Sequence, residues 1–205
     1  MNVGIINCGL GNIHSISKCI DDLGFKNHII NNPRELIDCE KIIFPGVGSF
    51  SKAMKIIEKD DWITNLKKKV LIEKTYFLGI CIGMQILAEE GFEIEKSKGL
   101  GFIPGSVMKL NDLGCKKTIP HIGWNNVEIA QKNQLYDNVE NNSDFYFDHS
   151  YAVLCKDKSN ITGITNHDID FVASVNKDNI YGTQFHPEKS SESGKRFLKN
   201  FLELK

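Results

Sequence analysis

One cysteine in this 205-residue chain lies where nucleophilic chemistry is favoured. Cys81 stands between Gly79 and Gly83, after the apolar run Tyr76–Ile80 and before a helical pattern. This G-x-C-x-G spacing is typical of a tight turn from strand to helix, where glycines allow close backbone approach. A helix N-terminus favours thiolate, and the Ile82 backbone N–H would face an oxyanion beside the sulfur. A lone cysteine can also be a small buried hydrophobe, the interpretation we prefer for Cys8, Cys19, Cys39, Cys115 and Cys155.

A histidine and a carboxylate near the C-terminus could serve such a thiol. His186 follows the strand-like run Ile180–Phe185, and Pro187 biases it towards extended backbone. Residues two apart in extended backbone face the same way, so Glu188 would lie beside His186. The carboxylate would hold one ring nitrogen and leave the other for the sulfur. Taken alone, the His-Pro-Glu sequence could equally form a surface turn.

The first half of the chain alternates short apolar runs with amphipathic stretches. This alternation predicts a parallel sheet joined by helical crossovers that cover both of its faces. The predicted strands are Val3–Asn7, Asn27–Ile30, Lys41–Phe44 and Tyr76–Ile80. The predicted helices are Asn12–Leu23, Pro33–Ile37, Ser51–Lys59, Trp62–Glu73 and Ile82–Glu90.

The second half consists mainly of short alternating runs, which predict a more antiparallel, β-rich region closed by a helix at Ser191–Leu202. The predicted strands are Phe102–Leu110, Asn125–Ile129, Phe145–Phe147, Tyr151–Cys155, Ile161–Thr165, Phe171–Asn176 and Ile180–Gln184. No repeat or linker interrupts the chain. We therefore expect one α/β domain over residues 1–205, with a mostly parallel central sheet and helices on both faces.

Composition excludes several classes of function. The formal net charge of −1 lacks the basic face that nucleic-acid binding requires, and Lys67–Lys69 fits a solvated helix face. No membrane-spanning run, targeting segment or metal-ligand spacing is visible, so we expect a cytoplasmic protein without metal or cofactor. Gly9 and Gly11 follow a strand, but His14 stands where a dinucleotide motif needs its third glycine.

These motifs resemble those of the class I, triad-type glutamine amidotransferases. The two signatures are Gly79–Gln85 and Gln184–Glu188. Three further segments carry the resemblance, which extends over nearly the whole chain: Gly9–Asn12, Phe44–Phe50 and Pro120–Asn125. The resemblance implies a glutaminase that releases ammonia for a separate (β/α)8-barrel cyclase subunit, in a heterodimer.

The resemblance also implies roles for particular residues. Cys81 would be the nucleophile, His186 the base and then the acid, and Glu188 the group that orients it. The oxyanion would be held by backbone N–H groups at Val47, Gly48 and Ile82. Glutamine would be bound by Gln85, Glu93, Ser150 and Tyr151. The barrel would dock on Asn12, Pro120, His121, Gly123, Trp124 and Asn125.

Other interpretations of these residues stay open. Glu93 could meet the glutamine ammonium or be an exposed loop carboxylate, and Trp124 could be a core aromatic or an interface anchor. The chain departs from the family at Asn7-Cys8-Gly9, where Asp-Tyr-Gly is usual, and at Asp148, where valine is common. A carboxylate at Asp148 could shift partner choice.

Three alternative functions are compatible with the sequence. The ammonia could be used to amidate a surface sugar, and not for amino-acid biosynthesis. The chain could also be a free-standing γ-glutamyl cysteine hydrolase, although that leaves the docking segment Pro120–Asn125 unexplained. A silent regulatory module would have no chemical need for an intact triad. The chain ends soon after Glu188, so we expect the ammonia-using site on another polypeptide.

Overall fold

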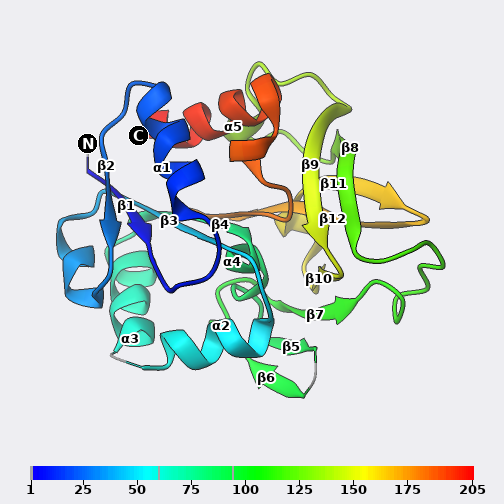
Figure 1. The fold of residues 1–205 in the computed structure, drawn as a ribbon, viewed down its shortest axis with the longest axis horizontal. Helices are drawn as coiled ribbons and strands as arrows, with labels where there is room; N and C mark the ends of the chain where they lie inside the picture. The colour runs from blue at the N-terminus through cyan, green and yellow to red at the C-terminus, as the bar shows by residue number, and fades with distance from the viewer. Residues whose placement is uncertain (1, 60, 94) are drawn as a thin grey trace.

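A computed structural model describes residues 2–59, 61–93 and 95–205, and its centre is one large twisted sheet (Figure 1). The strand order is β2-β1-β3-β4-β13-β12-β11-β8-β9. The first five strands in this order run parallel: β2 (Asn27–Ile30), β1 (Val3–Ile6), β3 (Lys41–Gly46), β4 (Tyr76–Cys81) and β13 (Ile180–Thr183).

The rest of the large sheet is antiparallel, and a smaller sheet packs beside it. The antiparallel extension consists of β12 (Ile169–Lys177), β11 (Ile161–His167), β8 (His121–Ile129) and β9 (Ser143–His149). The smaller sheet has the order β10 (Tyr151–Cys155), β7 (Gly105–Lys109), β5 (Glu90–Phe92) and β6 (Lys96–Lys98). The fold therefore has the predicted α/β class with a β-rich second half.

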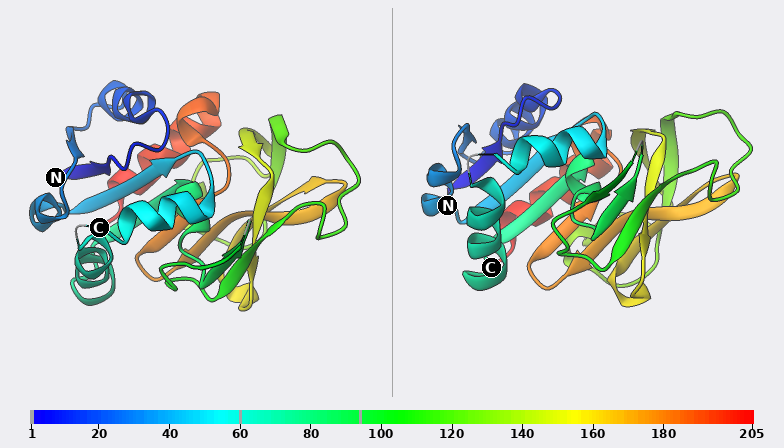
Figure 2. Two further views of the ribbon diagram at one scale, coloured as in Figure 1. Left: turned by 60° about the horizontal axis from the view of Figure 1, so that its bottom comes forward. Right: turned by 90° about the horizontal axis from the view of Figure 1, so that it is seen from below.

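Helices cover both faces of the parallel part (Figure 2). One face carries α1 (Ile13–Asp22) and α5 (Ser191–Glu203), and the other carries α2 (Phe50–Ile57), α3 (Trp62–Lys67) and α4 (Ile82–Gln85). Four short 3₁₀ helices and one π-helix are also described: the 3₁₀ helices η1 (Pro33–Asp38), η3 (Gln134–Tyr136), η4 (Lys158–Asn160) and η5 (Pro187–Lys189), and the π-helix η2 (Lys68–Ile72).

The helices bury apolar side chains against both faces because the central strands are mostly apolar on both sides. In β1, Ile5 belongs to the core beneath α1 and α5, whereas Ile6 belongs to the core beneath α2 and α3. Alternating strand residues face opposite sides, so a strand covered on both faces is apolar at most of its positions. Each fully buried Ile or Phe contributes about 1.5–3 kcal/mol.

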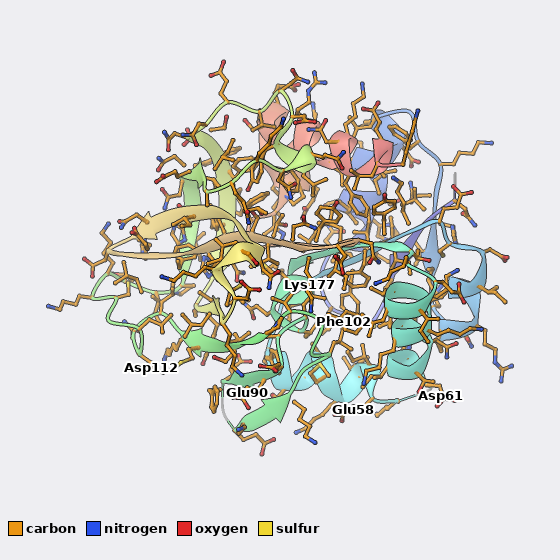
Figure 3. The ribbon with its side chains drawn as sticks, turned by 180° about the vertical axis from the view of Figure 1, so that it is seen from behind. Glu58, Asp61, Glu90, Phe102, Asp112 and Lys177 are labelled. Atoms are coloured by element: carbon orange, nitrogen blue, oxygen red, sulfur yellow. The ribbon has the colours of Figure 1, made fainter. Side chains whose placement is uncertain are left out.

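The smaller sheet is joined to the large one by a buried aromatic residue. Phe102 is fully buried and places its ring edge-on to Phe77 of β4, with ring centroids 6.4 Å apart. Lys177, at the end of β12, donates from Nζ to the Phe102 carbonyl at 3.3 Å (Figure 3). These contacts fix the chain that follows α4.

The helix predicted over Ile82–Glu90 is much shorter in the structure. The helix α4 ends at Gln85, and Glu90 begins β5. The carbonyls of Ile86 and Leu87 accept hydrogen bonds from Leu100 and Phe102, so the backbone pairs with a later segment instead of continuing the helix. The sequence also gave no sign of the three-residue strands β5 and β6, and β7 begins three residues later than predicted.

Within the described ranges, no helix is both long and apolar enough to cross a membrane.

Candidate active site

The carboxyl ends of β3, β4 and β13 bring the predicted catalytic residues to one edge of the sheet. In the parallel register Gly46 of β3 lies opposite Cys81, and Thr183 of β13 lies opposite Ile80. The chain leaving β13 therefore carries His186 to the edge where β4 delivers Cys81. Open α/β sheets commonly hold their ligands at this edge.

Cys81 lies on a sharp turn between β4 and α4. Its backbone has φ 55° and ψ −108°, a conformation that costs a residue with a side chain roughly 1–3 kcal/mol. Close packing holds this turn in place. A Cβ added to Gly83 would lie 1.9 Å from the Phe44 carbonyl oxygen, and one added to Gly79 would lie 2.3 Å from the Gly83 carbonyl oxygen. The flanking glycines are therefore required by the backbones that cross here.

The Cys81 side chain is nearly enclosed, with 4% of the residue exposed. Its sulfur contacts the Asp148 carbonyl oxygen at 3.9 Å and accepts from the Gln184 side-chain amide at 3.6 Å. Gln184 is fully buried and stands two residues before His186. No role was predicted for Gln184 from the sequence, although its period-two spacing with His186 and Glu188 was the available signal.

His186 and Glu188 form a buried pair beside this sulfur. His186 Nδ1 lies 2.9 Å from Glu188 Oε1, and the two side chains are only 4% and 6% exposed. The other ring nitrogen, Nε2, is buried without a hydrogen-bond partner among the described residues. Because the carboxylate occupies Nδ1, Nε2 is the nitrogen that remains for proton exchange with sulfur or substrate.

The charge state of His186 follows from its neighbours. Burial alone would lower the pKa of the imidazole, but the adjacent Cys81 side chain and the Glu188 carboxylate outweigh burial and raise it to about 10. The protonated ring is therefore favoured at neutral pH. A proton is thus available on the His186 ring for transfer to a bound group.

A cavity of about 150 Å³ opens beside this pair. Its walls are formed by Asn12, Pro45, Gly46, Val47, Asp148, His186, Glu188 and Lys189. Gly48 has φ +129°, a conformation available to glycine, and the loop at Val47 packs closely on Gly11. The predicted oxyanion loop is thus next to the predicted base. Asn12, predicted for the docking face, lines the same cavity.

The residues predicted to bind glutamine cluster around the start of β10, and none of them lines this cavity. Gln85 is buried and donates to the Tyr151 carbonyl and to Gln184 Oε1, both at 3.0 Å, so its amide nitrogen is committed within the protein. The Tyr151 hydroxyl donates to the Glu93 carbonyl at 3.3 Å. Ser150 joins β9 to β10.

The Glu93 carboxylate lies at the N-terminus of α2. Its Oε2 accepts from the Phe50 backbone N–H at 2.5 Å. Burial raises the pKa of this carboxyl, and the Phe50 N–H opposes that effect. Glu93 is thus held in a defined position by backbone, unlike a freely solvated loop carboxylate.

The predicted docking residues divide into exposed and buried groups. Trp124 and the neighbouring Ile122 are 54% and 59% exposed on β8. The Trp124 ring is edge-on to Tyr146 at 6.1 Å, and Lys189 Nζ lies 5.4 Å from the Tyr146 ring centroid. An aromatic and cationic path therefore runs from the exposed strand to the cavity. No role was predicted for Tyr146 or Lys189 from the sequence.

The other docking positions lie around the start of β8. Pro120 is exposed and follows a cis peptide bond, and Gly123 has φ +134°. His121 does not reach the surface: it is 5% exposed, because its position in β8 faces inward. Asn125 is partly exposed and donates to the Asn166 carbonyl at 2.8 Å.

Among the residues with described positions, no group of three or more His, Cys, Asp or Glu side chains is arranged to hold a metal ion.

Comparison with known proteins identifies the family. The profile of the class-I glutamine amidotransferases matches residues 4–204, and the chain belongs to this family. It is 44% identical to imidazole glycerol phosphate synthase subunit HisH 1 of Campylobacter jejuni strain RM1221, over 98% of this chain and 100% of that protein. It is 46% identical to subunit HisH 2 of Methanococcus maripaludis, over 98% of each chain.

Solved structures support the fold. A glutamine amidotransferase crystal structure superposes with a TM-score of 0.76 at 18% identity, covering 98% of this chain and 97% of that one. The structure of PurLQS from Thermotoga maritima matches with the same TM-score at 19% identity and the same coverage. The predicted fold class is thereby confirmed, and the chain is a glutamine amidotransferase enzyme.

We expect Gly83→Ala to destabilise the protein strongly, because the new methyl group would collide with the Phe44 carbonyl. Overpacking against backbone should lower the free energy of unfolding by about 3 kcal/mol, and Tm by roughly 6–12 °C. Thermal and urea unfolding would measure this change. The control is Gly24→Ala, which has positive φ but open space around its Cα, and should cost about 1 kcal/mol. Equal losses in the two variants would contradict the packing argument.

The His186 imidazole should titrate near pH 10, and Glu188→Gln should lower that midpoint because the variant removes the carboxylate beside Nδ1. Since the folded pKa lies above the ordinary value of 6.5, the stabilisation it gives is complete below about pH 6.5 and is lost towards pH 10. Ring NMR shifts against pH would give the midpoint. Glu192→Gln, at an exposed carboxylate paired with Lys195, is the control and should leave it unchanged.

Proposed function

We propose that this chain is the glutaminase subunit of an imidazole glycerol phosphate synthase. It would hydrolyse glutamine to glutamate and ammonia and pass the ammonia to a HisF-type (β/α)8-barrel cyclase subunit in histidine biosynthesis. The observation that carries the proposal is the buried Cys81, His186 and Glu188 constellation at the sheet edge, in a chain 40–46% identical to several HisH subunits. We take residues 1–205 as one amidotransferase domain.

The reaction begins at the sulfur. The Cys81 thiolate attacks the side-chain carbonyl carbon of glutamine, and the carbonyl π electrons move onto oxygen. Backbone N–H groups at Val47, Gly48 and Ile82 would stabilise this oxyanion. We assign Glu93 to the substrate ammonium and the Ser150–Tyr151 backbone to the body of glutamine.

His186 completes the reaction. Its Nε2 proton goes to the departing nitrogen, the C–N bond breaks, and ammonia leaves a γ-glutamyl thioester on Cys81. Water then gives a proton back to Nε2 and attacks the thioester carbon, which releases glutamate and restores the thiolate. Glu188 holds Nδ1 throughout, so the ring presents Nε2 in both steps.

The compartment proposed for this reaction is the cytoplasm. All six cysteines are free thiols in the structure. Free thiols are normal in a reducing compartment, which also keeps a thiolate nucleophile from being oxidised.

Glutamate release should depend on Cys81 and on the partner. Cys81→Ser should lower kcat/KM on the order of 10⁴-fold or more, because a hydroxyl is a far weaker nucleophile here. Cys155→Ser is the matched control: burial raises the pKa of the Cys155 thiol to about 12, so it carries little thiolate. Labelling with a diazo ketone analogue of glutamine, read by intact mass, should modify wild-type protein and Cys155→Ser but not Cys81→Ser.

Activity of the isolated chain should be weak and should rise when a HisF-type barrel and its acceptor are added. Coupled glutamate assays with and without the barrel would measure this. Full activity in the isolated chain would instead support the free-standing γ-glutamyl hydrolase. Absence of both labelling and activity, even with the barrel, would support a silent module.

Trp124→Ala should weaken docking of the barrel. Trp124 is an exposed aromatic on β8, the docking strand, which carries most of the residues predicted to dock the barrel. Such an aromatic is a typical interface anchor, and its loss should cost about 2 kcal/mol, or about 30-fold in Kd. Calorimetric titration of the barrel would measure the change. Ile37→Ala is the control, since Ile37 is 70% exposed but lies in η1, at the other end of the sheet. Unchanged affinity of the Trp124 variant would place the interface elsewhere.

A second candidate acceptor is a surface sugar that would be amidated by the same ammonia. Methanococcus maripaludis has two proteins with HisH names, which match this chain at 46% and 40% identity, so one genome can hold more than one such glutaminase. Asp148, in the cavity wall, marks where this chain departs from its family. Copurification with a barrel that fails to cyclise the histidine-pathway intermediate would favour the sugar acceptor.

A further inference from the structure

Three histidines that the mechanism does not use pack together beneath the docking strand. His121 begins β8, His149 ends β9 and His167 ends β11. His121 lies opposite His149 in the β8–β9 register, and its ring stacks on that of His167 with centroids 4.3 Å apart. His121 and His149 are only 5% and 6% exposed. Buried imidazoles of this kind need their nitrogens satisfied.

Hydrogen bonds join two of these histidines into a chain whose direction is fixed. His149 Nδ1 lies 2.9 Å from the Tyr151 carbonyl, which can only accept, so Nδ1 carries the proton. In the neutral ring, Nε2 is then an acceptor, and it lies 3.1 Å from His121 Nδ1, which must donate. His121 Nε2 in turn accepts from the Asn125 amide at 3.3 Å. Every donor and acceptor is matched only when both rings are neutral.

Neutral rings are what the surroundings favour. Burial lowers the pKa of His149 to about 3 and that of His121 to about 4. The titratable groups that act on the pair are His167, Lys117 and His186, each of which disfavours a further positive charge. The order of donors and acceptors is therefore maintained through the neutral pH range.

The two ends of this chain lie at functionally different places. At one end, Asn125 lies on β8, directly after the exposed Trp124. At the other end, the Tyr151 carbonyl also accepts from Gln85, the residue on the helix after Cys81. The carbonyl oxygen of Asp148, the residue before His149, contacts the Cys81 sulfur at 3.9 Å. The histidine chain therefore connects β8 to the segment that contacts the Cys81 sulfur and to which the proposed function assigns glutamine binding.

We propose that Asn125, His121 and His149 form a positioning relay that holds the 148–151 backbone in the geometry that binds glutamine and transmits docking of a barrel partner to it. This proposal rests on the proposed function. The relay residues do not touch the reacting atoms. They act by fixing the Tyr151 carbonyl and the segment around it, and a shift of Asn125 on docking would move that segment.

Replacing a relay imidazole by phenylalanine tests this, because the ring stacking is kept and the hydrogen bonds are removed. Alkylation of Cys81 by the diazo ketone analogue of glutamine gives a saturation constant KI and a maximal rate. His121→Phe and His149→Phe should raise KI about tenfold, with the maximal rate within about threefold of wild type. His121→Asn should restore most of the affinity, since its amide can donate from the position of Nδ1.

His167→Phe is the matched control. Its ring belongs to the same stack, but its Nε2 bonds to the Thr118 carbonyl at 3.1 Å, outside the relay. It should therefore keep the wild-type KI, whereas a merely structural role of the cluster would give it the same loss as His121→Phe. Thermal unfolding establishes that each variant is folded.

Stimulation by a saturating HisF-type barrel gives a second measurement. His121→Phe should lose about tenfold of that stimulation, and His121→Asn should recover it. If His121→Phe kept both the wild-type KI and the wild-type stimulation by the barrel, the relay would be overturned. Absence of labelling and of glutamate release in the wild type itself, with the barrel present, would overturn the proposed function instead.

Discussion

The site depends on the parallel pairing of β4 with β3 on one side and β13 on the other. This pairing places the carboxyl ends of three strands at one edge, so a sulfur, the proposed oxyanion loop and an imidazole meet although Cys81 and His186 are far apart in sequence. The approach is close enough that Gly83 touches the Phe44 carbonyl, and a side chain there would separate the strands from the helix. Backbone packing thus determines where the chemistry can occur.

The local environment gives two buried histidines different charge states. Glu188 and Cys81 favour the protonated form of His186 despite its burial, whereas His149, a short distance away and without a carboxylate, is held neutral by the same burial. One histidine is therefore protonated, as the proposed catalysis requires, and the other has a fixed pattern of donor and acceptor. The contrast arises from the neighbours, since both rings are almost completely enclosed.

Much of this arrangement could be predicted from sequence because its signals are local. The glycines around Cys81 and the two-residue spacing of His186 and Glu188 predict side-chain geometry directly. The length of α4 could not be predicted, since its end depends on hydrogen bonds from Leu100 and Phe102 to Ile86 and Leu87. The internal bonds of Gln85 and the burial of His121 likewise depend on strand register, which a single sequence does not contain.

Side chains along β8 point alternately outward and inward, and this affects how partner specificity can diverge among related glutaminases. Ile122, Trp124 and Asn126 point outward, whereas His121 and Val127 point inward. Substitutions at the outward positions can reshape the surface for a different partner while the inward positions keep the interior unchanged. A duplicated gene could therefore acquire a new binding specificity by changes on one side of a single strand, and its glutamine chemistry would be inherited intact.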